Sequence, residues 1–274
     1  MLITKALLVE NEACRDQIKL FEKFLDGAES IEATPENVQR AYAFGLNVAW
    51  TFEVLGLNFT GMLERNGYQA WYLNGKLHRE NGPAVINPDG SEHWYLNGKR
   101  HRTDGPAIVY PNGYQAWYLN GEQHRADGPA VIYSNGYQAW YLNDKRHRTD
   151  GPAVINSDGT KQYYLNDKLH RPDGPAVIYS SGTKYWYRNG KRHREDGPAV
   201  INSDGYQEWF QNGKYHRTDG PAIIYSSGTK YYYLNGKLLT EAEHRLRTQS
   251  DETQGCNGKI VEIEGIQYQL TEIK

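Results

Sequence analysis

The stretch WYLNGKLHRENGPAVIN, from Trp71 to Asn87, returns as WYLNGKRHRTDGPAIVY from Trp94 and as WYLNGEQHRADGPAVIY from Trp117. Its His-Arg pair recurs every 23 residues, at His78, His101, His124, His147, His170, His193 and His216. Self-similarity at a fixed period is the signature of a repeat protein, in which each unit buries its apolar face against its neighbours. The sequence therefore predicts an array of seven complete units and a truncated eighth that ends after YYYLNGK.

The apolar content of the chain is aromatic rather than aliphatic. Its 274 residues include 22 tyrosines and 7 tryptophans, and six of the tryptophans occupy the same slot of the repeat. These side chains combine a large buried area with groups that can hydrogen-bond. With 31 basic and 33 acidic residues the net charge is −2, so no general field attracts nucleic acid or an anionic membrane. Neither is an expected partner.

Neither export nor a disulfide framework is expected. The first residues, MLITKALLVENEACRDQ, hold a short apolar run that Glu10 and Glu12 interrupt, with no cleavage pattern after it. No segment has the roughly 20 consecutive apolar residues that span a bilayer. The two cysteines, Cys14 and Cys256, lie in different regions, which argues against both a disulfide framework and a cysteine zinc site. A cytoplasmic protein is the expectation.

Within one unit a short apolar run, a turn, an aromatic run and a second turn follow one another, as is typical of successive β-hairpins. Ala107–Tyr110 and Tyr114–Leu119 are the expected strands, joined by PNG, where other units have PDG, SNG, SDG or SSG. Each of these turns ends in Gly, which adopts a positive φ without a Cβ penalty. The second turn is LNG or LND, and its Asn tolerates the left-handed region. Two strands per unit is the simplest count, with room for a short third strand at KLHR.

The expected fold class is mainly β: an elongated single-sheet or solenoid array of antiparallel β-hairpins with a small N-terminal helical cap. Neighbouring units two strand spacings apart would give a rod roughly 75 Å long. The alternative is a four-bladed propeller whose 46-residue blades each contain two units. The alternation Tyr133, Asn156, Tyr179, Asn202, Tyr225 before the first turn favours the propeller, whereas equal loop lengths in all units favour the open array.

Four segments follow from these patterns. Residues 1–62 are the helical cap, 63–239 the seven to eight repeats, 240–250 a C-terminal capping helix and 251–274 a short hairpin. The cap should hold two or three helices, and ALLVENEACRDQIKLFEKFL places five apolar side chains near one helical face: Leu8, Ala13, Ile18, Phe21 and Phe24.

Two further helix starts are visible in the sequence. Thr34 followed by Pro35 combines an N-cap residue with a proline at the first helical position. Thr240 followed by Glu243 is a capping box. The eighth unit should therefore replace its return strand with a helix.

The units resemble the variant MORN repeat. Gly128 to Arg148 carries the features of that pattern, namely a Gly before an apolar strand, a Tyr-x-Asn-Gly-type turn, a second strand and a turn of the Asn-Gly-Lys type. The resemblance covers about Leu63 to Leu239, and the His-Arg-x-Asp insert makes these units longer than the usual MORN unit. It implies an elongated antiparallel sheet of hairpins. It also implies a binding scaffold, because bacterial members are often antitoxin-like and the repeat itself carries no catalytic activity.

Repetition of the His-Arg-x-Asp motif argues against an active site, because enzymes assemble one asymmetric constellation on a scaffold. Histidines of neighbouring units, roughly 9–10 Å apart, cannot share a zinc ion whose ligands lie within about 2 Å. The repeated slots hold no Ser or Cys nucleophile, and their glycines lack the following helix of a phosphate-binding loop. The sequence therefore predicts no enzymatic activity, no metal and no cofactor.

A structural role explains most of the fixed residues. Arginines would pair with aspartates and tie one hairpin to the next, while histidines fill a hydrogen-bonded slot in the turn. The alternative is that the arginines and aromatic rings read a small anionic or sugar-like ligand by charge and stacking. The first unit has Asn81 in the Asp position, which leaves Arg79 least neutralised. The arginines concerned are Arg79, Arg102, Arg125, Arg148, Arg171, Arg194 and Arg217.

The tryptophan slot leaves two interpretations open. The rings are either core residues or an exposed stripe that marks a partner site.

Function is expected at the positions that vary between units. The candidate contact residues occupy the x position of the His-Arg-x-Asp loops: Glu80, Thr103, Ala126, Thr149, Pro172, Glu195 and Thr218. The expected function is a non-enzymatic scaffold that binds another protein, either antitoxin-like or a phage-type inhibitor of a host or toxin protein. The alternative is a sequestering protein that binds nucleotides or glycans along the repeated aromatic and arginine rows.

Overall fold

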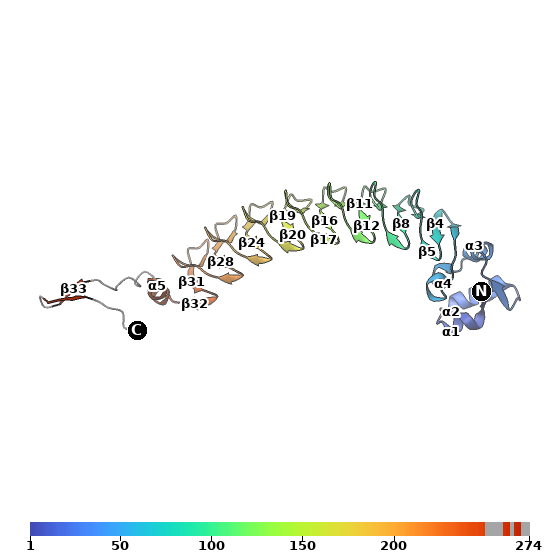
Figure 1. The fold of residues 1–274 in the computed structure, drawn as a ribbon, viewed down its shortest axis with the longest axis horizontal. Helices are drawn as coiled ribbons and strands as arrows, with labels where there is room; N and C mark the ends of the chain where they lie inside the picture. Colours follow the sequence, from blue (N-terminus) through green and yellow to red (C-terminus); the bar gives the residue numbers. More distant parts are fainter. Residues whose placement is uncertain (250–259, 264–265, 270–274) are drawn as a thin grey trace. The chain divides into compact units, whose positions relative to one another are not determined.

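The computed structural model describes residues 1–249, 260–263 and 266–269. The chain divides into two compact units, Met1–His147 and Arg148–Lys274. Both are mainly β, and in Figure 1 the hairpins of each unit follow one another in chain order. The expected fold class, an antiparallel sheet of repeated hairpins with a small group of N-terminal helices, is confirmed.

The N-terminal module precedes the repeats of the first unit. It contains β1 (Leu2–Thr4), α1 (Lys5–Glu10), α2 (Arg15–Leu25), β2 (Ser30–Glu32), α3 (Pro35–Phe44) and α4 (Val48–Val54). β1 and β2 pair antiparallel, and α3 packs against the first repeat strand, β3 (Gly61–Arg65) (Figure 1).

The module has four helices where two or three were expected. The stretch predicted as one amphipathic helix breaks between α1 and α2, where Glu12 adopts a positive φ of 62°. Leu8 and Phe21 are buried, and the other predicted apolar residues pack partly against them. The Thr34 hydroxyl accepts the Asn37 N–H and Pro35 occupies the first turn of α3, so this helix start is confirmed.

Each complete repeat has four two-residue strands. Two of them, the ladder strands, pair with ladder strands before and after them. In the first unit the ladder comprises β3 (Gly61–Arg65), β4 (Tyr68–Leu73), β6 (Val85–Ile86), β7 (Glu92–His93), β10 (Ile108–Val109), β11 (Gln115–Ala116), β14 (Val131–Ile132) and β15 (Gln138–Ala139). In the second unit it comprises β18 (Val154–Ile155), β19 (Lys161–Gln162), β22 (Val177–Ile178), β23 (Lys184–Tyr185), β26 (Val200–Ile201), β27 (Gln207–Glu208), β30 (Ile223–Ile224) and β31 (Lys230–Leu234).

The other two strands of each repeat form a side hairpin. In the first unit these are β8 (Tyr95–Leu96) with β9 (Lys99–Arg100), β12 (Tyr118–Leu119) with β13 (Glu122–Gln123), and β16 (Tyr141–Leu142) with β17 (Lys145–Arg146), while β5 (Lys76–Leu77) pairs with the end of β4. In the second unit these are β20 (Tyr164–Leu165) with β21 (Lys168–Leu169), β24 (Tyr187–Arg188) with β25 (Lys191–Arg192), and β28 (Phe210–Gln211) with β29 (Lys214–Tyr215), while β32 (Lys237–Leu239) pairs with the end of β31. The short third strand expected at KLHR is therefore present, but the expected count of two strands per 23-residue repeat is wrong.

The strand predicted from Tyr114 to Leu119 is interrupted at Trp117, because the two halves of this stretch have different partners. The Trp117 N–H donates to the Ala130 carbonyl of the next repeat at 2.8 Å, and its carbonyl accepts the His124 N–H of its own repeat at 3.1 Å. The tryptophan is thus the point at which the chain leaves the ladder and enters the side hairpin.

The ladder continues without a break at successive repeat junctions. β4 pairs with β6, β7 with β10 and β11 with β14 in the first unit. β19 pairs with β22, β23 with β26 and β27 with β30 in the second. A propeller of two-repeat blades requires every second junction to be unpaired, so this pairing rules out that alternative.

Turn chemistry confirms the sequence pattern. In the PNG turn the Gly113 N–H donates to the Tyr110 carbonyl at 3.0 Å, and Gly113 has a φ of 88°. In the LNG turns Asn97 and Asn120 have φ values of 52° and 53°, a left-handed conformation that asparagine tolerates better than most residues.

One face of the ladder is buried, and register decides which residues it contains. Ile108 lies opposite Ala116, and Ala116 lies opposite Val131. Ile108 is 4% exposed and Ala116 is fully buried. The alanine after each Gly-Pro, such as Ala130, is also fully buried, because its carbonyl bonds to the tryptophan of the preceding repeat.

The last repeat ends in α5 (Glu241–Gln249). The Thr240 N–H donates to Glu243 Oε2 at 2.9 Å and the Glu243 N–H donates to Thr240 Oγ1 at 3.2 Å, so the expected capping box is formed. His244 is 3% exposed and its Nε2 bonds to the Arg217 carbonyl at 2.7 Å. Beyond α5, β33 (Ile260–Ile263) and β34 (Ile266–Gln269) pair antiparallel; the rest of the predicted 251–274 hairpin lies outside the described residues.

The buried position after each Gly-Pro should not accept a side chain larger than that of alanine. Ala130→Val should lower the free energy of unfolding by about 1–3 kcal/mol, because an added methyl group overpacks a filled site. Ala126→Val is the matched control, since Ala126 is exposed and other repeats carry Thr in its place. Urea denaturation followed by circular dichroism measures both variants. Equal midpoints for the two variants would contradict the packing described for the alanine.

Candidate functional site

The His-Arg-x-Asp turns follow the side hairpins, and together they form the turn edge of each unit. The x residue is exposed in every turn, at Glu80, Thr103, Ala126, Thr149, Pro172, Glu195 and Thr218. Each turn is joined by a backbone bond to the side hairpin of the following repeat, such as the Arg102 N–H to the Tyr118 carbonyl at 3.1 Å. Exposed, variable side chains are thus presented at regular intervals along one edge.

The arginine of each turn is held from several sides. The Arg125 guanidinium carbon lies 4.1 Å from the centre of the Trp117 ring, Nε donates to Asp127 at 2.9 Å, and Nη1 donates to the Pro129 carbonyl at 3.2 Å. The same stacking joins Arg79 to Trp71, Arg102 to Trp94, Arg171 to Tyr163, Arg194 to Trp186 and Arg217 to Trp209, at 3.8–4.2 Å. Cation–π contacts of this kind are stronger when partly desolvated.

This geometry corrects one expectation about the Arg–Asp pairs. They link residues two apart within one turn, at Arg102, Arg125, Arg148, Arg194 and Arg217, so they do not tie one hairpin to the next. The arginines expected as candidate ligand contacts are therefore largely engaged inside their own turns. The tryptophans of the slot are half-buried, and an arginine lies over the ring of Trp71, Trp94, Trp117, Trp186 and Trp209, so the slot is neither simple core nor a bare exposed stripe.

The glycine of the Asp-Gly-Pro sequence makes room for the arginine. A Cβ atom built on Gly128 would lie 2.8 Å from the guanidinium carbon of Arg125, and one on Gly105 would lie 2.9 Å from that of Arg102. Neither glycine needs a positive φ, so the requirement comes from the flat approach of the guanidinium and not from the backbone conformation.

A double-mutant cycle tests whether the arginine guanidinium is the reason that this position requires glycine. Gly128→Ala should lower the free energy of unfolding by about 1–2 kcal/mol, the range for losing a partly desolvated cation–π contact. In an Arg125→Ala background the same glycine substitution should cost much less, because the clashing group is gone. Thermal or urea unfolding measures the four proteins. Equal costs in both backgrounds would show that the glycine is needed for another reason.

The histidines join each turn to the LNG turn of the following repeat. Nδ1 of His101 accepts the Asn120 N–H at 3.1 Å, and equivalent bonds join His78 to Asn97 and His216 to Asn235. In the neutral ring, the tautomer with its proton on Nε2 leaves Nδ1 able to accept this bond. The expected hydrogen-bonded slot for the histidines is confirmed, and it links consecutive repeats.

Open grooves separate successive turns in the second unit. One is lined by Arg171, Arg194 and Trp186, among others. On its wall the Glu195 carboxylate accepts from Arg188 Nη1 at 3.0 Å and lies 3.2 Å from His193 Nε2. His193 and Arg188 lower the pKa of this carboxyl group. Among the predicted contact residues, Glu195 is therefore tied into an ion pair.

A stack of tyrosines at the ladder turns was missed by the sequence reasoning. In the first unit the ring centres of Tyr110, Tyr114, Tyr133 and Tyr137 follow one another at 5.5, 4.7 and 5.4 Å, and Tyr133 is 45% exposed. In the second unit Tyr225, 43% exposed, lies between Tyr206 and Tyr231. The signal was the tyrosine on both sides of the PNG and SNG turns, since residues that flank such a turn share a face.

The ladder position that Ala116 occupies varies strongly between repeats, both in residue type and in burial. The residues there are Ala70, His93, Ala116, Ala139, Gln162, Tyr185, Glu208 and Tyr231. Glu208 is 6% exposed and its Oε1 accepts from the Tyr206 and Tyr215 hydroxyls at 2.5 and 2.6 Å. Burial and the bond to Glu208 raise the pKa of both tyrosines. This cluster is a satisfied polar core specific to one repeat.

His93 is the other buried titratable group at this position. It is 8% exposed, its ring lies edge-on to Tyr110 with centres 5.6 Å apart, and its Nδ1 has no hydrogen-bond partner in the described structure. Burial and the Arg100 cation lower the pKa of His93, while the Asp89 carboxylate acts in the opposite direction. The neutral ring is therefore favoured in the folded state.

Linkage gives the sign of the resulting pH dependence. Since the folded pKa lies below the unfolded value near 6.5, the contribution of His93 is present above that value and is lost as pH falls through the folded pKa. Between about pH 7.5 and 5, the wild-type chain should lose more stability than His93→Ala. Alanine fills the same slot in the next two repeats. Parallel pH profiles of the urea midpoint for the two proteins would contradict the assignment.

No metal cluster or membrane-spanning helix is found in the described part of the chain. Among those residues no group of three or more His, Cys, Asp or Glu side chains is placed to hold a metal ion, and no helix there is long and apolar enough to cross a membrane. No protein-family model matches the sequence, and no curated protein matches it significantly. The resemblance to variant MORN repeats therefore stays a prediction.

Proposed function

We propose that the chain is a non-enzymatic repeat scaffold that binds another protein along the turn edge. The observation that carries the proposal is that the residues that hold each turn together are different from the residue that it exposes. His, Arg, Asp and the Pro carbonyl bond to one another or to the next repeat, and the Gly makes room for the guanidinium, whereas the x residue is exposed and changes from turn to turn. Such an edge can be altered by substitution without disturbing the fold.

A protein partner suits this edge better than a small ligand. A small ligand read by the arginines would compete with the aromatic ring, the carboxylate and the proline carbonyl that already engage each guanidinium. The x residues are acidic, neutral or apolar and differ from one turn to the next, so the edge presents an irregular surface and not a row of identical ligand sites. By resemblance to the variant MORN repeat, we propose an antitoxin-like or phage-type inhibitory role for this binding.

A second candidate function rests on the tyrosine stack of the first unit. Its partly exposed rings offer faces on which sugars or nucleobases can stack. On this alternative the chain sequesters glycans or nucleotides, and binding would map to Tyr114 and Tyr133 rather than to the turn edge.

A matched pair of triple variants tests the proposal. Thr103→Arg, Ala126→Arg and Thr149→Arg change the turn edge, while Pro111→Arg, Ser134→Arg and Ser157→Arg add the same charge at exposed positions of the ladder turns. A partner captured from a bacterial lysate is purified and titrated by calorimetry against each protein. The turn-edge variant should bind at least about tenfold more weakly, a loss of about 1.4 kcal/mol.

The control variant should bind within about twofold of wild type. Circular dichroism checks that both variants fold. Equal weakening of the two, or weakening by the control alone, overturns the turn edge as the binding surface. Weakening by Tyr114→Ala and Tyr133→Ala instead, together with saturable glycan or nucleotide binding, would favour the alternative.

A further inference from the structure

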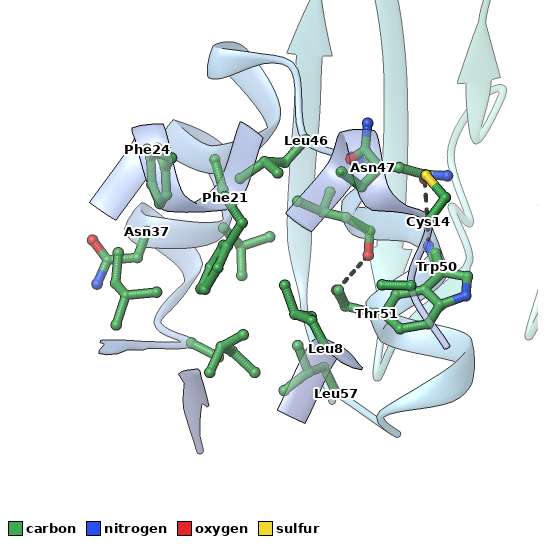
Figure 2. A pocket seen from close by; sticks show the side chains of 18 of the residues that line it. Leu8, Cys14, Phe21, Phe24, Asn37, Leu46, Asn47, Trp50, Thr51 and Leu57 are labelled. Carbon is green, nitrogen blue, oxygen red and sulfur yellow. Dashed lines mark hydrogen bonds between the residues drawn. The ribbon is translucent and has the colours of Figure 1, made fainter. Parts of the chain in front are cut away.

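The N-terminal module encloses a pocket that the proposed function does not use. It lies between the four helices of the module, with Phe21 and Phe24 of α2 on one side and Trp50 and Thr51 of α4 on the other (Figure 2). Leu8 of α1 also lines it. All its lining residues belong to the first 57 residues, so the pocket is built by the module alone.

The pocket is large for a module of this size. Its volume is about 280 Å³, whereas well-packed protein interiors have few voids larger than a water molecule. An apolar cavity of about 150 Å³ already binds benzene and stays free of water. A space of this size therefore matches a molecule of about two aromatic rings.

The pocket reaches from the core to the surface. Leu8, Phe21 and Leu46 are buried, whereas Glu12 and Cys14, which also line it, are exposed. A ligand can therefore enter from solvent without unfolding of the helices. The pocket is distinct from the grooves of the turn edge, which belong to the repeats.

The lining offers apolar contact more than hydrogen bonds. Gln17 Oε1 accepts the Asn47 N–H at 2.7 Å, Thr51 Oγ1 donates to the Val48 carbonyl at 2.6 Å and Asn37 Nδ2 donates to the Glu32 carbonyl at 3.0 Å. These polar groups of the lining are thus already engaged. A ligand gains affinity here by burying apolar surface.

The charges around the pocket are acidic. Its ionisable lining residues among those described are Glu12, Glu32 and Cys14, with no Lys or Arg. The whole segment 1–62 holds nine acidic and five basic residues. An anionic group at the rim beside Glu12 or Glu32 would face like charges. The nearby Arg40 guanidinium is already engaged, since it lies 5.8 Å from the centre of the Phe24 ring and donates to Asn37 Oδ1 at 3.2 Å.

From these features we propose that the N-terminal module binds a small apolar molecule of about two aromatic rings that is neutral or positively charged. The rings lie between the α2 phenylalanines and Trp50, and any polar or cationic group lies at the solvent-exposed rim of the pocket, near Glu12 or near Glu32. This site is independent of the turn edge and of any protein partner there.

A pair of fluorescent probes tests both the site and its charge preference. 1-Naphthylamine is neutral and has two fused rings, and 1-naphthylamine-5-sulfonate has the same rings with a negative charge. The full chain should bind the neutral probe saturably with a stoichiometry of one, and the sulfonate at least about tenfold more weakly. Glu12→Gln with Glu32→Gln should narrow this difference, because it removes the like charges at the rim.

Matched leucine variants on α3 locate the binding. Ala41 lines the pocket and Ala43 is exposed two residues further along the same helix. Ala41→Leu places three more carbon atoms in the space and should weaken the neutral probe at least about tenfold, the loss expected when about two ring carbons lose contact. Ala43→Leu should leave the affinity within about twofold of wild type.

The outcomes are decisive in either direction. Thermal unfolding checks that each variant folds, and Ala13→Leu, which also fills the pocket, replaces Ala41→Leu if that variant does not fold. Probe binding that both filling variants leave unchanged would place the probe elsewhere, for instance on the exposed tyrosines, and would overturn the proposal. Non-saturable binding, or equal affinity for the two probes, would overturn it as well.

Discussion

The architecture depends on a set of contacts, here called the arginine clasp, that the arginine of a His-Arg-x-Asp turn makes with residues close to it in the chain. In the third repeat the Arg125 guanidinium lies between the Trp117 ring and the Cα of Gly128, and its nitrogens donate to Asp127 and to the Pro129 carbonyl. One side chain thereby fixes five positions of the repeat at once. The clasp holds the end of the side hairpin against the start of the next ladder strand, so the chain can repeat this path without additional core residues.

Links between repeats come from other groups. Backbone bonds of the ladder, the tryptophan N–H to the next alanine carbonyl, and the histidine Nδ1 to the next asparagine N–H all cross from one repeat to its successor. Because these bonds use backbone atoms and invariant side chains, they leave the x position and the ladder turns free to differ. The residues that vary at the surface are therefore different from the residues that hold the repeats together, as the proposed binding scaffold requires.

The two ends of the repeats are closed by helices in different ways. α5 replaces the missing return strand of the last repeat, and the buried His244 bonds to the Arg217 carbonyl. At the other end the helices of the N-terminal module pack beside β3 and β4, with Phe52 stacked on Phe59 and edge-on to Tyr72. Helical ends cover strand edges that would otherwise be open to pairing with another chain. The N-terminal module also contains the pocket described above.

The sequence by itself determined the period, the hairpins, the left-handed asparagine turns, the Thr34 and Thr240 helix starts and the hydrogen-bonded place of the histidines. Apart from the histidine bonds, whose asparagine partners lie 19 residues further along the chain, these features are encoded locally, by residues a few positions apart whose conformational preferences do not depend on distant partners. Tertiary structure decided which strand each residue joins. Trp117 could not be recognised as the break between two hairpins, because the break arises from its bond to Ala130 thirteen residues later. The tyrosine stack and the buried Glu208 cluster likewise depend on register and on which face turns inward. A one-residue shift would move every one of these side chains to the other face, so spacing alone could not place them.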